Sequence, residues 1–227
     1  MMQLADDTQR TSIVGRMGSG KTAAAVWHLS ESNYRHMPWV IYDFKQDQLL
    51  AELGALDGAE HIGLDTVPRK PGLYFVHPLP HETEAVQEQL WKIWAQESTG
   101  VYIDEGYMMA TPPKVNPAFR SLLTQGRSKR IPMIILSQRP VWLDRFVFSE
   151  SDFYQVFALN HSGDRKTMME YIPADLNKRL PEYWSYYHDV SAAETVVCKP
   201  VPFGPEVIES VARGLASLKK KRTRVLV

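Results

Sequence analysis

The sequence predicts an α/β fold built on a mainly parallel central sheet. Short apolar segments alternate along the chain with segments of helical periodicity, which is the pattern of parallel α/β sheets. The apolar segments are continuous hydrophobic runs, as expected of strands that are covered on both faces. Hydrophobic residues make up 44% of the 227 residues, which is enough for one sizeable core.

The elements follow from these two patterns. Six short apolar runs are expected to be strands: 11–14, 39–44, 72–79, 100–105, 131–138 and 153–159. Four segments with helix-forming residues or helical periodicity are expected to be helices: 21–32, 81–98, 116–130 and 204–221. Asn116 and Pro117 occupy the N-cap and first helical positions that suit them.

The last quarter of the chain changes character. Residues 183–190 and 194–199 predict a hairpin or edge pair of strands. The Tyr and Trp side chains of 183–187 are expected to pack at the edge of the sheet, and the alternative is a platform on which bases stack. We therefore expect residues 1–175 to form the core. Residues 176–227 are expected to form a C-terminal extension of hairpin, helix and basic tail packed on that core.

Composition excludes several classes of protein. Lys plus Arg and Asp plus Glu both number 26, so a uniformly basic DNA-coating protein is disfavoured, although a local basic patch remains possible. The single cysteine, Cys198, excludes an intrachain disulfide and a cysteine zinc site. The first ten residues lack the apolar segment of a secretory signal, and no apolar run approaches the roughly 20 residues of a membrane span. These features predict a soluble, cytoplasmic protein.

Residues 13–22, IVGRMGSGKT, carry the strongest functional pattern. They match G-x-x-x-x-G-K-[ST], with an apolar strand before the turn and a helix after it. Backbone N–H groups of such a turn, together with a helix N-terminus, form an anion site. The pattern predicts a Walker A loop for ATP, in which Lys21 reaches the β- and γ-phosphates and Thr22 ligates Mg²⁺. The expected nucleotide-binding residues are Gly15, Arg16, Met17, Gly18, Ser19, Gly20, Lys21 and Thr22.

Two further strand ends carry polar residues that suit ATP hydrolysis. The strand VYIDE ends in Asp104, expected to hold Mg²⁺ as a Walker B aspartate, and Glu105, expected to polarise the attacking water. The strand IILSQRP places Gln138 where ligand sites of parallel sheets lie, at the carboxyl edge. We expect Gln138 to sense the γ-phosphate or to orient the water. Asp43 and Lys45 are expected to shape the nucleotide site or a subunit contact.

Together these stretches resemble the FtsK/HerA superfamily of DNA-pumping ATPases. Five stretches carry the resemblance: GRMGSGKT, VIYDFKQD, VYIDE, GRSKRIPMIILSQRP and NHSGDRKTMMEY. The resemblance covers roughly residues 10–172, and Ser137 stands where the family usually has threonine. It implies a P-loop NTPase of the RecA-like (ASCE) type, with a three-layer fold and a small C-terminal hairpin-plus-helix extension.

Small size narrows the resemblance to the genome-packaging ATPases of tailless icosahedral viruses with an internal membrane, the tectivirus type. Such enzymes drive double-stranded DNA into a preformed procapsid at a unique vertex. The resemblance therefore implies a homo-oligomeric ring (hexamer or pentamer) with double-stranded DNA, the capsid vertex and membrane-associated packaging proteins as partners. It also implies action in the host cytoplasm during assembly and a place in the virion at the packaging vertex.

In such a ring a neighbour's arginine completes each active site. Arg127 is the first candidate, Arg130 the second and Arg139 the third. DNA contact is expected to be independent of sequence and to use basic side chains that reach phosphates. The DNA candidates are Lys114 in the segment 108–116, Lys129 and Arg130, together with the basic tail KKKRTR (residues 219–224). The tail is also expected to suit capsid docking or simple solubility.

Other functions remain open on the sequence alone. The alternatives are a conjugation-coupler-like or filamentous-phage-assembly-like motor, a nucleotide kinase or switch, and an inactive vertex protein with a relic site. A kinase needs a lid and a base for its acceptor, and neither is visible in the sequence. The adjacent acids Asp104 and Glu105 favour water as the nucleophile.

Overall fold

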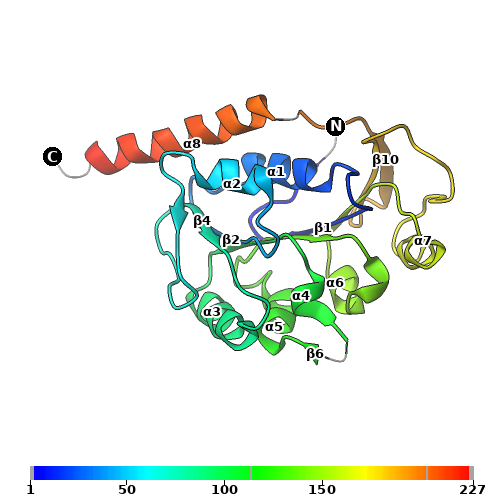
Figure 1. Ribbon diagram of the computed structural model, residues 1–227, viewed down its shortest axis with the longest axis horizontal. Coiled ribbons are helices and arrows are strands. Elements are labelled where there is room, and N and C mark those ends of the chain that lie inside the picture. Colours follow the sequence, from blue (N-terminus) through cyan, green and yellow to red (C-terminus); the bar gives the residue numbers. More distant parts are fainter. Residues whose placement is uncertain (1–2, 113, 203, 225–227) are drawn as a thin grey trace.

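A computed structural model describes residues 3–112, 114–202 and 204–224, with the backbone alone for Lys114 and residues 219–224. Within these residues nine strands form one sheet in the order β10-β9-β8-β1-β7-β5-β2-β4-β3 (Figure 1). The strands from β8 to β3 run parallel, and β9 and β10 are antiparallel at one end. The strands are β1 (Arg10–Val14), β2 (Pro38–Tyr42), β3 (Glu60–His61), β4 (Gly72–Val76), β5 (Gly100–Ile103), β7 (Met133–Ser137), β8 (Phe153–Val156), β9 (Ser185–Asp189) and β10 (Glu194–Cys198); β6 (Lys114–Val115) lies outside this sheet.

Helices cover both faces of the sheet. Figure 1 shows α1, α2 and α8 on one face, with α3, α4, α5 and α6 on the other. The helices are α1 (Lys21–Glu31), α2 (Gln48–Gly54), α3 (Thr83–Gln96), α4 (Tyr107–Ala110), α5 (Pro117–Gln125), α6 (Arg145–Ser149), α7 (Ser162–Met169) and α8 (Pro205–Arg224), with the 3₁₀ turn η1 (Pro140–Trp142). This three-layer arrangement confirms the predicted fold class.

Alternation along each strand divides the core into two layers. In β1 and β2, Ile13 and Ile41 pack with the α1 and α8 side of the sheet, whereas Val14 and Tyr42 pack with the opposite side. This is the period of two that strands impose on side-chain direction. All four side chains are fully buried, which explains why the strands are continuous apolar runs in the sequence.

Most of the expected elements are present with shorter ends. All six expected strands and all four expected helices form, and the hairpin of β9 and β10 is confirmed. Asn116 caps α5 as expected, because its side chain accepts a 3.0 Å hydrogen bond from the Phe119 N–H. The sequence did not predict α2, β3, α4, β6, α6 or α7, which are mostly too short to show a periodic pattern. The boundary at residue 175 stays a prediction.

The aromatic stretch before and within β9 behaves in two ways. Tyr187 is buried and stacks with Phe153 and His28, so its predicted packing in the sheet is confirmed. Tyr183 is 49% exposed and precedes the strand, so the prediction is wrong for that residue. The reason is that its backbone turns in the left-handed region, with φ of 63°, before β9 begins.

Candidate active site

The ends of four neighbouring parallel strands carry the candidate site. In the order β1-β7-β5-β2, their carboxyl ends lie at one edge of the sheet. The Walker A loop (residues 15–22) follows β1, and Gln138 follows β7. Asp104 and Glu105 follow β5, and Asp43 and Lys45 follow β2. Residues far apart in the sequence thus reach a single edge because the connections return to it.

The Walker A loop wraps closely between β1 and α1. At Gly15 a Cβ atom would lie 2.6 Å from Cβ of Phe157 and 2.7 Å from Oγ of Ser19, so the turn requires glycine. Gly18 and Gly20 have φ angles of 70° and 95°. The chain between β1 and α1 therefore forms the glycine-dependent turn that the sequence predicted.

Lys21 is buried at the start of α1. Its Nζ donates a 3.0 Å hydrogen bond to the carbonyl oxygen of Arg16. Burial, and after it the positive charge of Lys45, lowers the pKa of Lys21 to about 8. An anion bound in the loop would oppose both effects, because it supplies a counter-charge to Lys21, whose Nζ hydrogen-bonds to a neutral carbonyl oxygen. Thr22 lies half-buried in the same helical turn.

The two acidic residues after β5 are buried and share their partners. The ammonium of Lys45 pairs with Oε1 of Glu105 and lies 3.9 Å from Oδ2 of Asp104. Nε2 of Gln138 donates a 3.0 Å hydrogen bond to the same oxygen of Glu105. Burial raises the pKa of Asp104 to about 6, although the ammonium of Lys45 opposes this shift. The structure thus brings Gln138 into contact with Glu105, the second of the two predicted acids.

Four buried oxygen atoms of the acidic and Walker A residues at this edge have no hydrogen-bond partner among the described residues. They are Oδ2 of Asp43, Oδ2 of Asp104, Oε2 of Glu105 and Oγ of Ser19. A buried polar atom without a partner is costly, so such atoms mark places where a ligand completes the site. Oxygen donors beside a phosphate-binding loop are also the ligands that Mg²⁺ prefers. The residues present therefore fit a magnesium-bound nucleotide.

The turn after β2 holds Lys45 in place. The carboxylate of Asp43 is buried, and its Oδ1 accepts a 3.1 Å hydrogen bond from the Asp47 N–H. Nδ1 of His77, at the end of β4, lies 3.5 Å from Oδ2 of Asp43. Sequence reasoning missed His77 because it lay inside the expected strand 72–79, whereas β4 ends at Val76 and leaves His77 at the carboxyl edge of the sheet. Asp43 thus closes the turn that carries Lys45 to the acids.

The first two arginine-finger candidates lie at the opposite edge of the sheet. The segment that carries Arg127 and Arg130 precedes β7, so it lies at the amino ends of the parallel strands. Arg127 pairs with Asp152, which also accepts a hydrogen bond from the N–H of Arg10 at the start of β1. Arg130 pairs with Asp7. Neither arginine reaches the Walker A loop of its own chain. Either residue could therefore contribute to catalysis only in the active site of a neighbouring subunit.

The other basic residues that the sequence suggested for catalysis or DNA contact make different contacts. Lys129 pairs with Glu97 at 2.7 Å, and its ammonium lies 3.9 Å from the ring centre of Trp94. Arg139 follows Gln138 directly, and its Nε donates a 2.8 Å bond to Oδ2 of the buried Asp164. The side chain of Lys114 and the side chains of the basic tail lie outside the described residues. Their predicted DNA contacts stay predictions.

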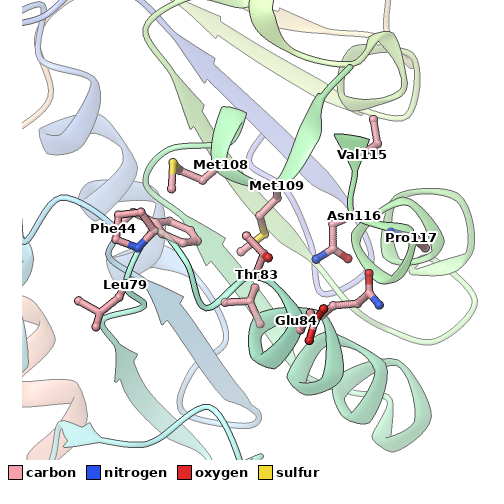
Figure 2. Close-up of a pocket in the computed structure, with 12 residues that line it drawn as sticks. Phe44, Leu79, Thr83, Glu84, Met108, Met109, Val115, Asn116 and Pro117 are labelled. Carbon is pink, nitrogen blue, oxygen red and sulfur yellow. The ribbon is translucent and has the colours of Figure 1, made fainter. Parts of the chain in front are cut away.

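The segment 108–116, expected to contact DNA, folds back on the molecule. Ala110 and Val115 form an antiparallel bridge, and the buried Met109 faces a cavity of about 250 Å³ together with Met108. Figure 2 shows this cavity between Phe44, the start of α3 and the α4–β6 segment. No basic side chain lines the described wall of the cavity, so its chemistry does not suit phosphate.

No described helix combines the length and hydropathy of a bilayer-spanning segment. Among the same residues, no group of three or more His, Cys, Asp or Glu side chains is arranged to hold a metal ion.

The chain is similar in sequence and in fold to viral genome-packaging proteins. It is 45% identical over 233 residues to the DNA packaging ATPase P9 of Enterobacteria phage PRD1, and the match covers 98% of this chain and 99% of that protein. No family model matches the chain. The genome packaging NTPase B204 of Sulfolobus turreted icosahedral virus 2, in complex with AMPPCP, superposes with a TM-score of 0.67 at 20% identity. That match covers 87% of this chain and 100% of B204.

A more distant structure shares the same fold. ATPases 2 and 3 of EssC from Geobacillus thermodenitrificans match with a TM-score of 0.63 at 14% identity, over 96% of this chain and 45% of that chain. At such low identities the structural likeness concerns the fold alone. It agrees with the three-layer arrangement and the parallel sheet described above.

Proposed function

The chain belongs to the family of phage DNA packaging ATPases that includes P9 of PRD1, and on that premise we propose that it hydrolyses ATP to drive double-stranded DNA into a preformed procapsid. The observation that carries the proposal is the convergence of Lys21, Asp104, Glu105 and Gln138 at one edge of the sheet. Membership of this family supports DNA packaging as the function, and the geometry of the site supports phosphate chemistry as the reaction.

In this proposal each residue has a defined task. The Walker A loop and Lys21 bind the β- and γ-phosphates, and Thr22 and Asp104 hold Mg²⁺. The metal, when bound, neutralises charge that develops on the phosphate oxygens. Glu105 polarises the attacking water through its unpartnered Oε2, while Gln138 holds the other oxygen. The carboxylate is therefore oriented before a nucleotide arrives.

Coupling to DNA follows from assembly into a homo-oligomeric ring. Arg127 is placed to act only on the site of a neighbouring subunit, since it lies at the amino edge of its own sheet. Lys114, Lys129 and Arg130 are the proposed DNA contacts. We place the ring in the host cytoplasm during assembly and at the packaging vertex of the virion, with capsid and membrane-associated packaging proteins as partners.

The test is the phenotype of particles assembled with Lys21→Ala. We expect capsids that are complete but empty, because the substitution removes phosphate binding and leaves the surface unchanged. Lys92→Ala on α3 is the matched control, and its particles should fill normally. The purified chain should also release phosphate from ATP, faster with double-stranded DNA present. Filled particles with Lys21→Ala, or transfer of phosphate to an added nucleoside instead of water, would contradict the proposal.

A further inference from the structure

A second cavity adjoins the Walker A loop on the side away from the acids. Its volume is about 730 Å³, within the range of about 300–1,000 Å³ that is usual for small-molecule sites. Arg16, Gly18 and Ser19 of the Walker A loop form one wall, the end of β8 forms another, and residues 176–184 form the third. The cavity therefore opens directly onto the predicted phosphate site.

The order of the strands shows on which side of the Walker A loop this cavity lies. In the sheet, β8 and β7 lie on opposite sides of β1, and the acids and Gln138 all lie on the β7 side. If the γ-phosphate of a triphosphate in the Walker A loop points toward Glu105 and Gln138, the rest of the nucleotide extends toward the β8 side. The nucleoside then lies on the β8 side of the loop.

The walls of the cavity are joined by one arginine. Nη1 of Arg165 donates hydrogen bonds of 3.0 and 2.8 Å to the carbonyl oxygens of Leu159 and Asn160, after β8. Its Nε donates a 3.0 Å bond to Oδ1 of Asn177, on the third wall. These bonds fix the distance between two walls that come from different parts of the chain. The cavity is thus formed before any ligand binds.

Tyr183 places an aromatic ring at the junction of this cavity with the Walker A loop. Its Cδ1 would lie 3.4 Å from a Cβ atom built on Gly20, so the ring covers that glycine. The side chain is 49% exposed and lines the cavity. Its φ of 63° is unfavourable for a bulky residue, so the backbone there is held by its surroundings.

From this geometry we propose that the cavity binds the nucleoside part of the nucleotide, with the base stacked on Tyr183. The inference rests on the proposed function, because it assumes a nucleoside triphosphate in the Walker A loop. Aromatic rings bind bases through their π-faces without reading base identity, so the affinity gain extends to nucleoside triphosphates generally. Tyr183 and Arg165 lie outside the Walker A and Walker B motifs, and neither motif reveals them.

The test compares ATP with inorganic tripolyphosphate, which has the phosphates and no nucleoside. Tyr183→Asn removes the ring and keeps a residue that tolerates positive φ, whereas Tyr183→Phe keeps the ring. By titration calorimetry with Mg²⁺ we expect Tyr183→Asn to weaken ATP binding about ten-fold and to leave tripolyphosphate binding unchanged. Tyr183→Phe should stay within about two-fold of the unsubstituted chain for both ligands. Phe146→Ala, which removes an exposed ring on α6, should change neither affinity.

Other outcomes separate this inference from the proposed function. Equal loss for ATP and tripolyphosphate would mean that Tyr183 only supports the loop, and would overturn the inference. Unchanged ATP binding with weaker binding of double-stranded DNA would assign the cavity to DNA and also overturn it. If the unsubstituted chain bound tripolyphosphate and hydrolysed ATP while Tyr183→Asn behaved identically, the inference alone would fail. Absence of ATP binding by the unsubstituted chain would contradict the proposed function, and the inference with it.

Discussion

The two edges of the parallel sheet carry charged residues in opposite ways. At the carboxyl edge, Lys21, Asp104 and Glu105 are buried, and three carboxylate oxygens there have no hydrogen-bond partner among the described residues. At the amino edge, Arg127 and Arg130 are about three-fifths exposed and each pairs with a single carboxylate, although Arg10 is buried beside Asp152. Buried, incompletely satisfied charge is costly and marks a ligand site, whereas an exposed ion pair contributes little to stability.

This contrast separates residues that act within their own chain from those that can act only on another molecule. The carboxyl edge gathers the proposed phosphate, metal and water ligands of one chain, and in our proposal it lacks only the arginine of a neighbour. The amino edge presents cations on the surface, held by pairs weak enough to exchange partners. The predictions below compare substitutions at the two edges and begin with the largest expected effect.

The largest effect is expected for Glu105→Gln, which removes the charge and keeps the shape. We expect kcat for ATP hydrolysis to fall about 10³-fold, within the range for loss of a general base, while ATP still binds. Glu97→Gln makes the same chemical change at the amino edge, where Glu97 pairs with Lys129, and should leave basal hydrolysis unchanged. Single-turnover hydrolysis and nucleotide binding measure both effects. Comparable losses for the two variants would remove the distinction between the edges.

Arg127→Ala should abolish most activity only if rings form. We expect a loss of about 10³-fold in kcat, the lower range for an arginine finger. Mixing Arg127→Ala subunits with Lys21→Ala subunits should restore hydrolysis, because an Arg127→Ala subunit keeps Lys21 and its neighbour supplies Arg127. Asp152→Asn, which weakens the ion pair and keeps Arg127, is the control and should remain active. Full activity of Arg127→Ala alone would exclude it as the finger.

Lys45→Ala tests the contact that organises the carboxyl edge. Without its ammonium, Glu105 loses one of the two groups that orient it, so we expect kcat to fall about ten- to a hundred-fold. Lys45→Arg should recover part of the loss, and Lys92→Ala should show none. In a Glu105→Gln background, Lys45→Ala should have little further effect, since its partner is already neutral. An additive loss in the double variant would show that Lys45 acts elsewhere.

Much of this site could be predicted from the sequence because its motifs are local. The spacing from Gly15 to Thr22 specifies a loop, and Asp104 follows a run of strand residues directly. The pairing of Lys45 with Glu105 is not local, since it depends on β2 lying beside β5 in a sheet whose order is not the chain order. Sequence patterns predict where strands form, but they do not predict which strands lie side by side in the sheet.

Tyr183 was mispredicted for a different physical reason. Aromatic residues favour strands, and Tyr186 and Tyr187 in the same stretch do lie in β9. The ring of Tyr183 lies against Gly20 of the Walker A loop, far away in the sequence, and its backbone is left-handed, neither of which a local pattern shows. Side chains on irregular segments beside a motif are therefore the part of a site that sequence reasoning misses most readily.

The smallest effect is expected for the double variant Lys129→Ala/Arg130→Ala. Both side chains already pair with carboxylates. Exchanging these pairs for DNA phosphates therefore adds less binding free energy than two unpaired cations would add. We expect DNA affinity to fall several-fold and the slope of log K against log salt to become shallower by about one to two. Lys70→Ala/Lys92→Ala removes the same charge elsewhere and should leave the slope unchanged. Equal slopes for the two double variants would restrict DNA contact to other residues, and the cations of the amino edge would then serve only the neighbouring subunit.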